Sequence, residues 1–98
     1  MVKIHGKYCG PNWTAGKVLA AKNASDKDFQ VKPIDDLDAA CRIHDKDIRD
    51  KGNSFKVDTK LMKKAEKIAR SPKYSLKLRA KAQFVAESMS RTRLLRGR

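Results

Sequence analysis

The chain contains two cysteines, Cys9 and Cys41, so only one intramolecular disulfide is possible. It has 98 residues, of which 40% are apolar. A chain of this size buries only a modest core and often depends on a disulfide or a metal ion for stability. If the bridge forms, it contributes roughly 3–4 kcal/mol on the chain-entropy model, and it indicates an oxidising compartment or particle.

Residues 35 to 51 have the spacing of an amphipathic helix. Its expected buried face is formed by Leu37, Cys41, His44 and Ile48. Asp35 or Asp36 can cap the start, and Gly52 can end the helix. On such a face His44 is by default a hydrogen-bonded core histidine. Asp45 follows it, however, so one helix presents a general base beside a ligand for a hard cation.

Residues 6 to 13, Gly-Lys-Tyr-Cys-Gly-Pro-Asn-Trp, are rich in turn residues and lack helical or strand periodicity, which predicts a loop. Calcium takes about six to eight oxygen ligands, and a tight loop can turn successive backbone carbonyls inward while one carboxylate supplies charge. Asp45 is the candidate carboxylate. An ordinary surface turn is the simpler interpretation of the loop alone, but a Cys9–Cys41 bridge would hold it against the helix near Asp45.

These two segments resemble the secreted phospholipase A2 family. Residues 8–10, Tyr-Cys-Gly, match its calcium loop, and residues 6–10, Gly-Lys-Tyr-Cys-Gly, are particularly similar to the plant enzymes. Residues 33–45 match its active-site helix, where two adjacent cysteines are usual and this chain keeps only the second. The second half resembles the phospholipase domain of parvovirus minor capsid proteins, through residues 44–46, 57–62 and 80–84. The resemblance covers roughly residues 6 to 89.

The resemblance implies calcium-dependent hydrolysis of the sn-2 ester of glycerophospholipids to a fatty acid and a lysophospholipid. It implies that His44 deprotonates a water molecule, that Asp58 orients the imidazole, and that the amide of Gly10 donates to the oxyanion. The implied cofactor is Ca²⁺, and the implied ligands are the carboxylate of Asp45 and the carbonyls of Tyr8, Gly10 and Asn12.

The sequence departs from the family pattern in three places. Asn12 stands where the loop usually has a second glycine, and we expect Asn to tolerate the left-handed backbone needed there. Ile48 replaces a tyrosine four residues after His44. Residues 14–32 are longer than the corresponding segment of the family, and we expect them to form a loop with a short helix near Val18 to Lys22.

The expected fold is mainly α and phospholipase A2-like, one domain over residues 1–98 with one disulfide. It consists of a calcium loop, an antiparallel helix pair at about 35–51 and 55–70, and a C-terminal helix at about 74–92. We expect the later helices to bury Leu61, Ala65, Ile68, Leu78, Ala82, Val85 and Met89. The turn at 52–54 is short enough to make the pair antiparallel. Asp58 would then face His44, and its alternative role is a first-turn acid that favours the helix dipole.

Positive charge is concentrated in the second half of the chain. Residues 59–98 hold 13 basic and two acidic side chains, so 11 of the 13 net positive charges lie there. Four of the lysines, Lys60, Lys63, Lys64 and Lys67, share the polar side of the second helix, and residues 91–98 form a basic tail. Such a face is most often simply solvated; its functional interpretations are attraction to an anionic phospholipid membrane interface or to nucleic acid.

Two further interpretations compete with the enzyme. The first is a catalytically weak or inactive basic module that binds nucleic acid or anionic lipid, for example within a viral particle. The second is a lipid- or receptor-binding module that keeps the fold and the calcium. No apolar run approaches the length of a membrane span, and residues 1–5 do not resemble a signal peptide. We therefore expect a protein that is secreted after removal of a signal, or one that is virion-associated.

Overall fold

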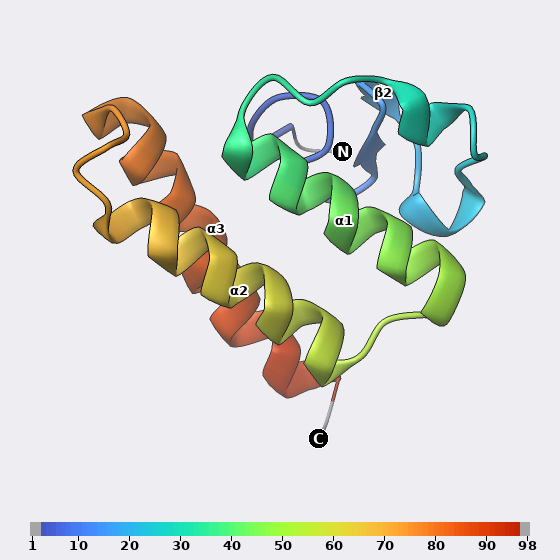
Figure 1. Ribbon diagram of the computed structural model, residues 1–98. Coiled ribbons are helices and arrows are strands. Elements are labelled where there is room, and N and C mark those ends of the chain that lie inside the picture. Colours follow the sequence, from blue (N-terminus) through green and yellow to red (C-terminus); the bar gives the residue numbers. More distant parts are fainter. Residues whose placement is uncertain (1–2, 97–98) are drawn as a thin grey trace. The chain divides into compact units, whose positions relative to one another are not determined.

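The computed structural model describes residues 3–96 and is mainly helical, which confirms the expected class (Figure 1). Residues 97 and 98 of the basic tail lie outside the described range. The elements in chain order are β1 (Trp13–Thr14), β2 (Lys17–Val18), two 3-10 turns, η1 (Ala21–Asn23) and η2 (Asp28–Gln30), and the helices α1 (Asp36–Lys51), α2 (Phe55–Arg70) and α3 (Leu76–Leu95). The chain divides into two compact units, Met1–Gly52 and Asn53–Arg98.

Helix α1 begins and ends as its sequence predicts. The side chain of Asp35 caps the helix by accepting from the backbone N–H of Asp38 at 2.9 Å. Gly52 ends it with φ 83°, a left-handed conformation that glycine adopts without strain. Its N–H donates to the carbonyl of Ile48 at 2.8 Å.

The buried face of α1 is broader than the expected one, because it includes two carboxylates. The buried residues of this helix are Leu37, Asp38, Ala40, Cys41 and Asp45, the side chain of His44 is only 10% exposed, and Ile48 is half-buried. The two carboxylates, those of Asp38 and Asp45, turn inward toward hydrogen-bond donors of the N-terminal segment. The spacing of apolar residues does not predict inward-facing carboxylates, because their burial depends on hydrogen-bond donors far away in the sequence.

Asp38 holds the start of the N-terminal loop. Its fully buried carboxylate accepts from the backbone N–H of Lys7 at 2.9 Å and from that of Tyr8 at 2.8 Å. It also accepts from the N–H of Ile34 at 3.0 Å. Gly6 has φ 62°, and a Cβ atom at that position would collide with the same carboxylate. Glycine is therefore required here for both conformation and space.

The predicted disulfide is present. Cys9 and Cys41 are bonded, with their Cα atoms 5.1 Å apart, and both residues are buried. The bridge joins the loop to α1 one helical turn before Asp45. Both the disulfide and the carboxylate of Asp38 therefore fasten the loop to the same helix.

Residues 13–32 form a small cap on α1, which consists of a hairpin followed by two short 3-10 helices. Strands β1 and β2 pair in antiparallel register through a two-residue turn. Ala15 and Gly16 occupy the turn with φ 58° and 76°, as a type I′ turn requires. The short helix expected near Val18 to Lys22 lies slightly later and is a 3-10 helix: Lys17–Val18 is a strand, and η1 covers Ala21–Asn23.

Aromatic and charged contacts fasten this cap. The ring of Tyr8 stacks on that of Phe29, with centroids 6.1 Å apart, and its hydroxyl lies 2.5 Å from the carbonyl oxygen of Val31. The guanidinium of Arg49, from α1, lies over the same Phe29 ring, 4.9 Å from its centroid. It also forms an ion pair with Asp26 at 2.8 Å. Residues 14–32 thus complete the core of their unit.

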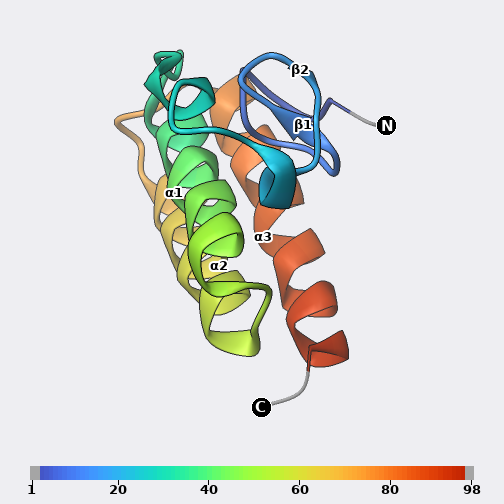
Figure 2. The same cartoon turned by 90° about the vertical axis from the view of Figure 1, so that its right-hand side faces the viewer.

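Helices α2 and α3 form the second unit and pack side by side (Figures 1 and 2). The expected inward residues of α2, Leu61, Ala65 and Ile68, are buried. On α3, Ala82 and Val85 are buried as expected, Ala86 joins them, and Leu78 and Met89 are only half-buried. Helix α3 begins at Leu76 because Ser75 caps it, accepting from the N–H of Leu78 at 3.1 Å.

We expect Asp38→Asn to destabilise the first unit by roughly 2–4 kcal/mol, because the amide cannot accept from all three N–H groups and loses the charge that strengthens these bonds. Urea unfolding followed by the fluorescence of Trp13 measures this, since its indole N–H donates to the carbonyl of Gly6 at 2.9 Å. The control is Asp36→Asn, an exposed first-turn acid, for which we expect no more than about 1 kcal/mol. Equal effects of the two substitutions would contradict the role of Asp38.

Candidate functional site

The neighbours His44 and Asp45 lie on α1, and their side chains are each 10% exposed. His44 Nδ1 is 3.8 Å from Asp45 Oδ1. The other carboxylate oxygen, Oδ2, is 3.4 Å from the hydroxyl of Thr14, which donates to it from the end of β1. The hairpin thus brings a buried hydroxyl to the carboxylate that the sequence predicts as a cation ligand.

Burial raises the pKa of Asp45 to about 6, and the neighbouring His44 and the hydroxyl of Thr14 offset only part of this increase. A carboxyl group whose charged form is this unfavourable has little compensation for its buried charge. A bound cation would supply that compensation. The electrostatics at Asp45 therefore fit the role of a metal ligand.

Two of the predicted loop ligands have backbone conformations that few residue types adopt. Gly10 has φ 141°, which suits only glycine, and Asn12 has φ 53°, the left-handed conformation expected of it. The carbonyl of Asn12 accepts from the N–H of Leu19 at 3.0 Å and retains a second lone pair. Within residues 3–96, the carbonyls of Tyr8 and Gly10 accept no hydrogen bond. These hard oxygen donors, together with Asp45, suit calcium.

Among the described residues, no group of three or more His, Cys, Asp or Glu side chains is arranged to hold a metal ion. The predicted calcium site is of a different kind, because it combines one carboxylate with backbone carbonyls.

Asp58, the predicted partner of His44, lies in the first turn of α2 in the second unit. Its side chain is 1% exposed, and Arg96 donates from Nε to its Oδ2 at 3.2 Å. Arg93 lies beside this pair, donating to the hydroxyl of Thr59 at 3.3 Å, with its guanidinium 4.9 Å from the ring centroid of Phe55. The end of α3 is thus fastened to the start of α2. The pairing of Asp58 with His44 stays a prediction.

Three polar residues with long-range contacts, two in the first unit and one in the second, were not identified in the sequence analysis. Asp38 carries a signal that was missed: an acid three residues after the capping Asp35 is a pattern of helix starts. Thr14 and Arg96 carry no such signal, since their partners Asp45 and Asp58 lie 31 and 38 residues away along the chain.

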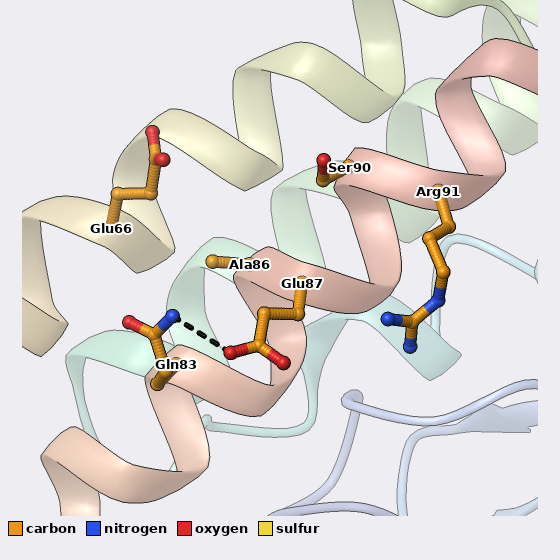
Figure 3. Close-up of a pocket in the computed structure, with 6 residues that line it drawn as sticks. All are labelled: Glu66, Gln83, Ala86, Glu87, Ser90 and Arg91. Carbon is orange, nitrogen blue, oxygen red and sulfur yellow. Dashed lines mark hydrogen bonds between the residues drawn. The ribbon is translucent and has the colours of Figure 1, made fainter.

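A groove of about 210 Å³ lies elsewhere, between α2 and α3 (Figure 3). Its lining residues are Glu66, Gln83, Ala86, Glu87, Ser90 and Arg91. None of the predicted catalytic or calcium-binding residues contributes to it.

No helix within residues 3–96 is long and apolar enough to cross a membrane. Comparison of the chain with protein-family models, curated proteins and solved structures finds no match. The resemblance to phospholipases therefore rests on the residues and motifs of the sequence.

The raised pKa of Asp45 predicts how the stability of the metal-free protein varies with pH. The stability contributed by a group whose pKa is raised on folding is complete below its unfolded value, 3.8, and is lost as the pH rises through about 6. A rise of about two units corresponds to roughly 3 kcal/mol. With chelator present, we expect the wild-type protein to lose up to this amount between about pH 4 and 8, relative to Asp45→Asn. Parallel pH profiles of the two proteins in urea unfolding would contradict the assignment.

Proposed function

We propose that this chain is a calcium-dependent phospholipase A2, which hydrolyses the sn-2 ester of glycerophospholipids to a fatty acid and a lysophospholipid. The observation that carries the proposal is the buried carboxylate of Asp45 beside His44. Both lie on a helix that a disulfide joins to the loop of residues 6–13. The resemblance of both segments to the family adds the reaction type.

In this proposal, the carboxylate of Asp45 and the carbonyls of Tyr8, Gly10 and Asn12 would hold the cation. The chemistry that bound calcium supplies is electrostatic: positive charge at the substrate phosphate and at the ester carbonyl.

The remaining chemistry belongs to side chains and backbone of the chain itself. His44 accepts a proton from a water molecule as the water oxygen bonds to the ester carbonyl carbon, and it returns the proton to the glycerol oxygen when the ester bond breaks. Asp58 is proposed to hold the imidazole in the required tautomer and to stabilise its protonated form. The N–H of Gly10 is proposed to donate to the developing oxyanion. No serine or cysteine nucleophile is needed.

The proposal extends to the surroundings of the enzyme. Its partner is a phospholipid interface, since the substrate is presented there. A secreted or virion-associated location is part of the same proposal, and the disulfide is compatible with either.

The decisive measurement is fatty-acid release from anionic and zwitterionic vesicles, with calcium and with chelator. We expect release only with calcium, and we expect Asp45→Asn to abolish it while the helical circular dichroism is retained. His44→Gln should remove turnover, by about a thousandfold or more, yet keep calcium binding, because the base and the ligand are different side chains. Full activity of Asp45→Asn would refute the metal assignment, and loss of calcium binding in His44→Gln would indicate a structural histidine.

The alternative is a basic module that binds nucleic acid without catalysis. The observation that favours it is the exposure of four lysines on α2, Lys60, Lys63, Lys64 and Lys67. Under this alternative, replacing all four by glutamine should weaken duplex binding and reduce the slope of log affinity against log salt by about four. Under the enzyme proposal, the same variant keeps calcium-dependent hydrolysis of zwitterionic vesicles. Tight, salt-sensitive duplex binding without hydrolysis on any vesicle would favour the alternative.

A further inference from the structure

Helix α3 carries apolar side chains on two opposite sides. Its inner side buries Ala82, Val85 and Ala86. On the opposite side four large apolar residues are exposed: Leu76 (79%), Phe84 (52%), Leu94 (59%) and Leu95 (83%). We call the outer face of α3 the stripe made of Leu76, Lys77, Ala80, Phe84, Glu87, Arg91, Leu94 and Leu95. These residues recur at three- and four-residue steps, so they share one side of the helix.

This exposure distinguishes α3 from its neighbour. Seven large apolar side chains are exposed among the described residues, and four of them lie on the outer face of α3 while none lies on α2. The exposed side of α2 carries lysines instead. Single exposed apolar residues are ordinary on protein surfaces, but a row along one helix face marks an interaction surface.

The charge around the outer face indicates what it contacts. Residues 53–96 hold 13 basic and three acidic side chains. Lys77 and Arg91 lie within the stripe itself. Its one acidic member, Glu87, accepts a hydrogen bond from Gln83 at 2.9 Å (Figure 3). The partner must therefore be anionic and must also offer an apolar region.

We propose that the outer face of α3 binds the surface of an anionic phospholipid membrane. Phe84, Leu94 and Leu95 enter the boundary between headgroups and acyl chains, while Lys77 and Arg91 contact lipid phosphates. A helix of 20 residues extends about 30 Å and can lie flat in this boundary.

A membrane fits these residues better than the other anionic or apolar partners do. Nucleic acid phosphates would pair with the basic residues but leave the four large apolar side chains in water. A second copy of the chain would cover the apolar residues, but each copy carries a net charge of +13, which opposes association. A membrane surface satisfies both parts of the stripe.

This inference deepens the proposed function, because it names the surface that meets the substrate phase. It does not require hydrolysis, and the membrane contact is measured as binding in chelator. A failure of membrane binding and a failure of the enzymatic proposal are therefore distinguishable.

The test is sedimentation of the full chain with phosphatidylglycerol vesicles and with phosphatidylcholine vesicles, in chelator. We expect binding to the anionic vesicles, and we expect the double variant Phe84→Ser, Leu95→Ser to weaken it about tenfold or more. Because both residues are exposed, its helical circular dichroism should match the wild type. The matched control replaces two exposed apolar residues of the first unit, Val18→Ser and Ile34→Ser, and should bind as the wild type does.

A second pair of variants separates a specific face from general charge. Lys77→Gln, Arg91→Gln removes two charges from the outer face, and Lys63→Gln, Lys64→Gln removes two from α2. We expect the first variant to weaken binding to anionic vesicles several-fold more than the second.

Several results would overturn the proposal. Equal weakening by the two charge variants shows that only net charge matters. Unchanged binding of Phe84→Ser, Leu95→Ser shows that the apolar residues do not enter the membrane. Duplex DNA binding without vesicle binding assigns the basic residues to nucleic acid. A dimer, detected by light scattering and lost in the same double variant, assigns the face to a second copy.

Discussion

The buried carboxylate of Asp38 is the interaction on which the first unit depends. A loop as rich in turns as residues 6–13 has many accessible conformations, and ordering it costs about 1–2 kcal/mol of backbone entropy per residue. Three backbone N–H groups, from Lys7, Tyr8 and Ile34, converge on this carboxylate. Each such bond involves a charged acceptor in a buried setting, where hydrogen bonds are strongest. The position of Cys9, and of the carbonyls after it, follows from this convergence.

The sequence allowed prediction of whatever depends on neighbours along the chain. The caps at Asp35 and Gly52, the extent of α1 and α2, and the buried residues Leu61 and Ala65 all follow from local patterns. The disulfide was predictable because two cysteines permit one bridge. The burial of the Asp38 carboxylate, the hairpin and the contact between Arg96 and Asp58 were not predictable in this way. Each joins residues distant in sequence, and buried polar side chains do not follow the periodic spacing from which helices and strands are predicted.

The same limits apply to the candidate site. His44 and Asp45 could be identified because their residue types are unusual on a helix face. Thr14, which donates to Asp45, could not, because a threonine in a short strand is unremarkable until the type I′ turn places it. The two units also differ in character. In the first, buried carboxylates organise loops, whereas in the second a simple apolar pattern organises two helices beneath a strongly basic surface.

The contacts of Asp38 have a consequence for the order of events during oxidative folding. Because the carboxylate holds Lys7 and Tyr8 beside α1, the thiol of Cys9 is brought close to that of Cys41 before any oxidant acts. Such proximity raises the effective concentration of one thiol at the other far above its value in an unfolded chain, in which 32 residue positions separate the two cysteines. Oxidation then locks a loop that is already in place. The bond therefore joins two segments that the backbone N–H groups of Lys7 and Tyr8 also hold together through Asp38.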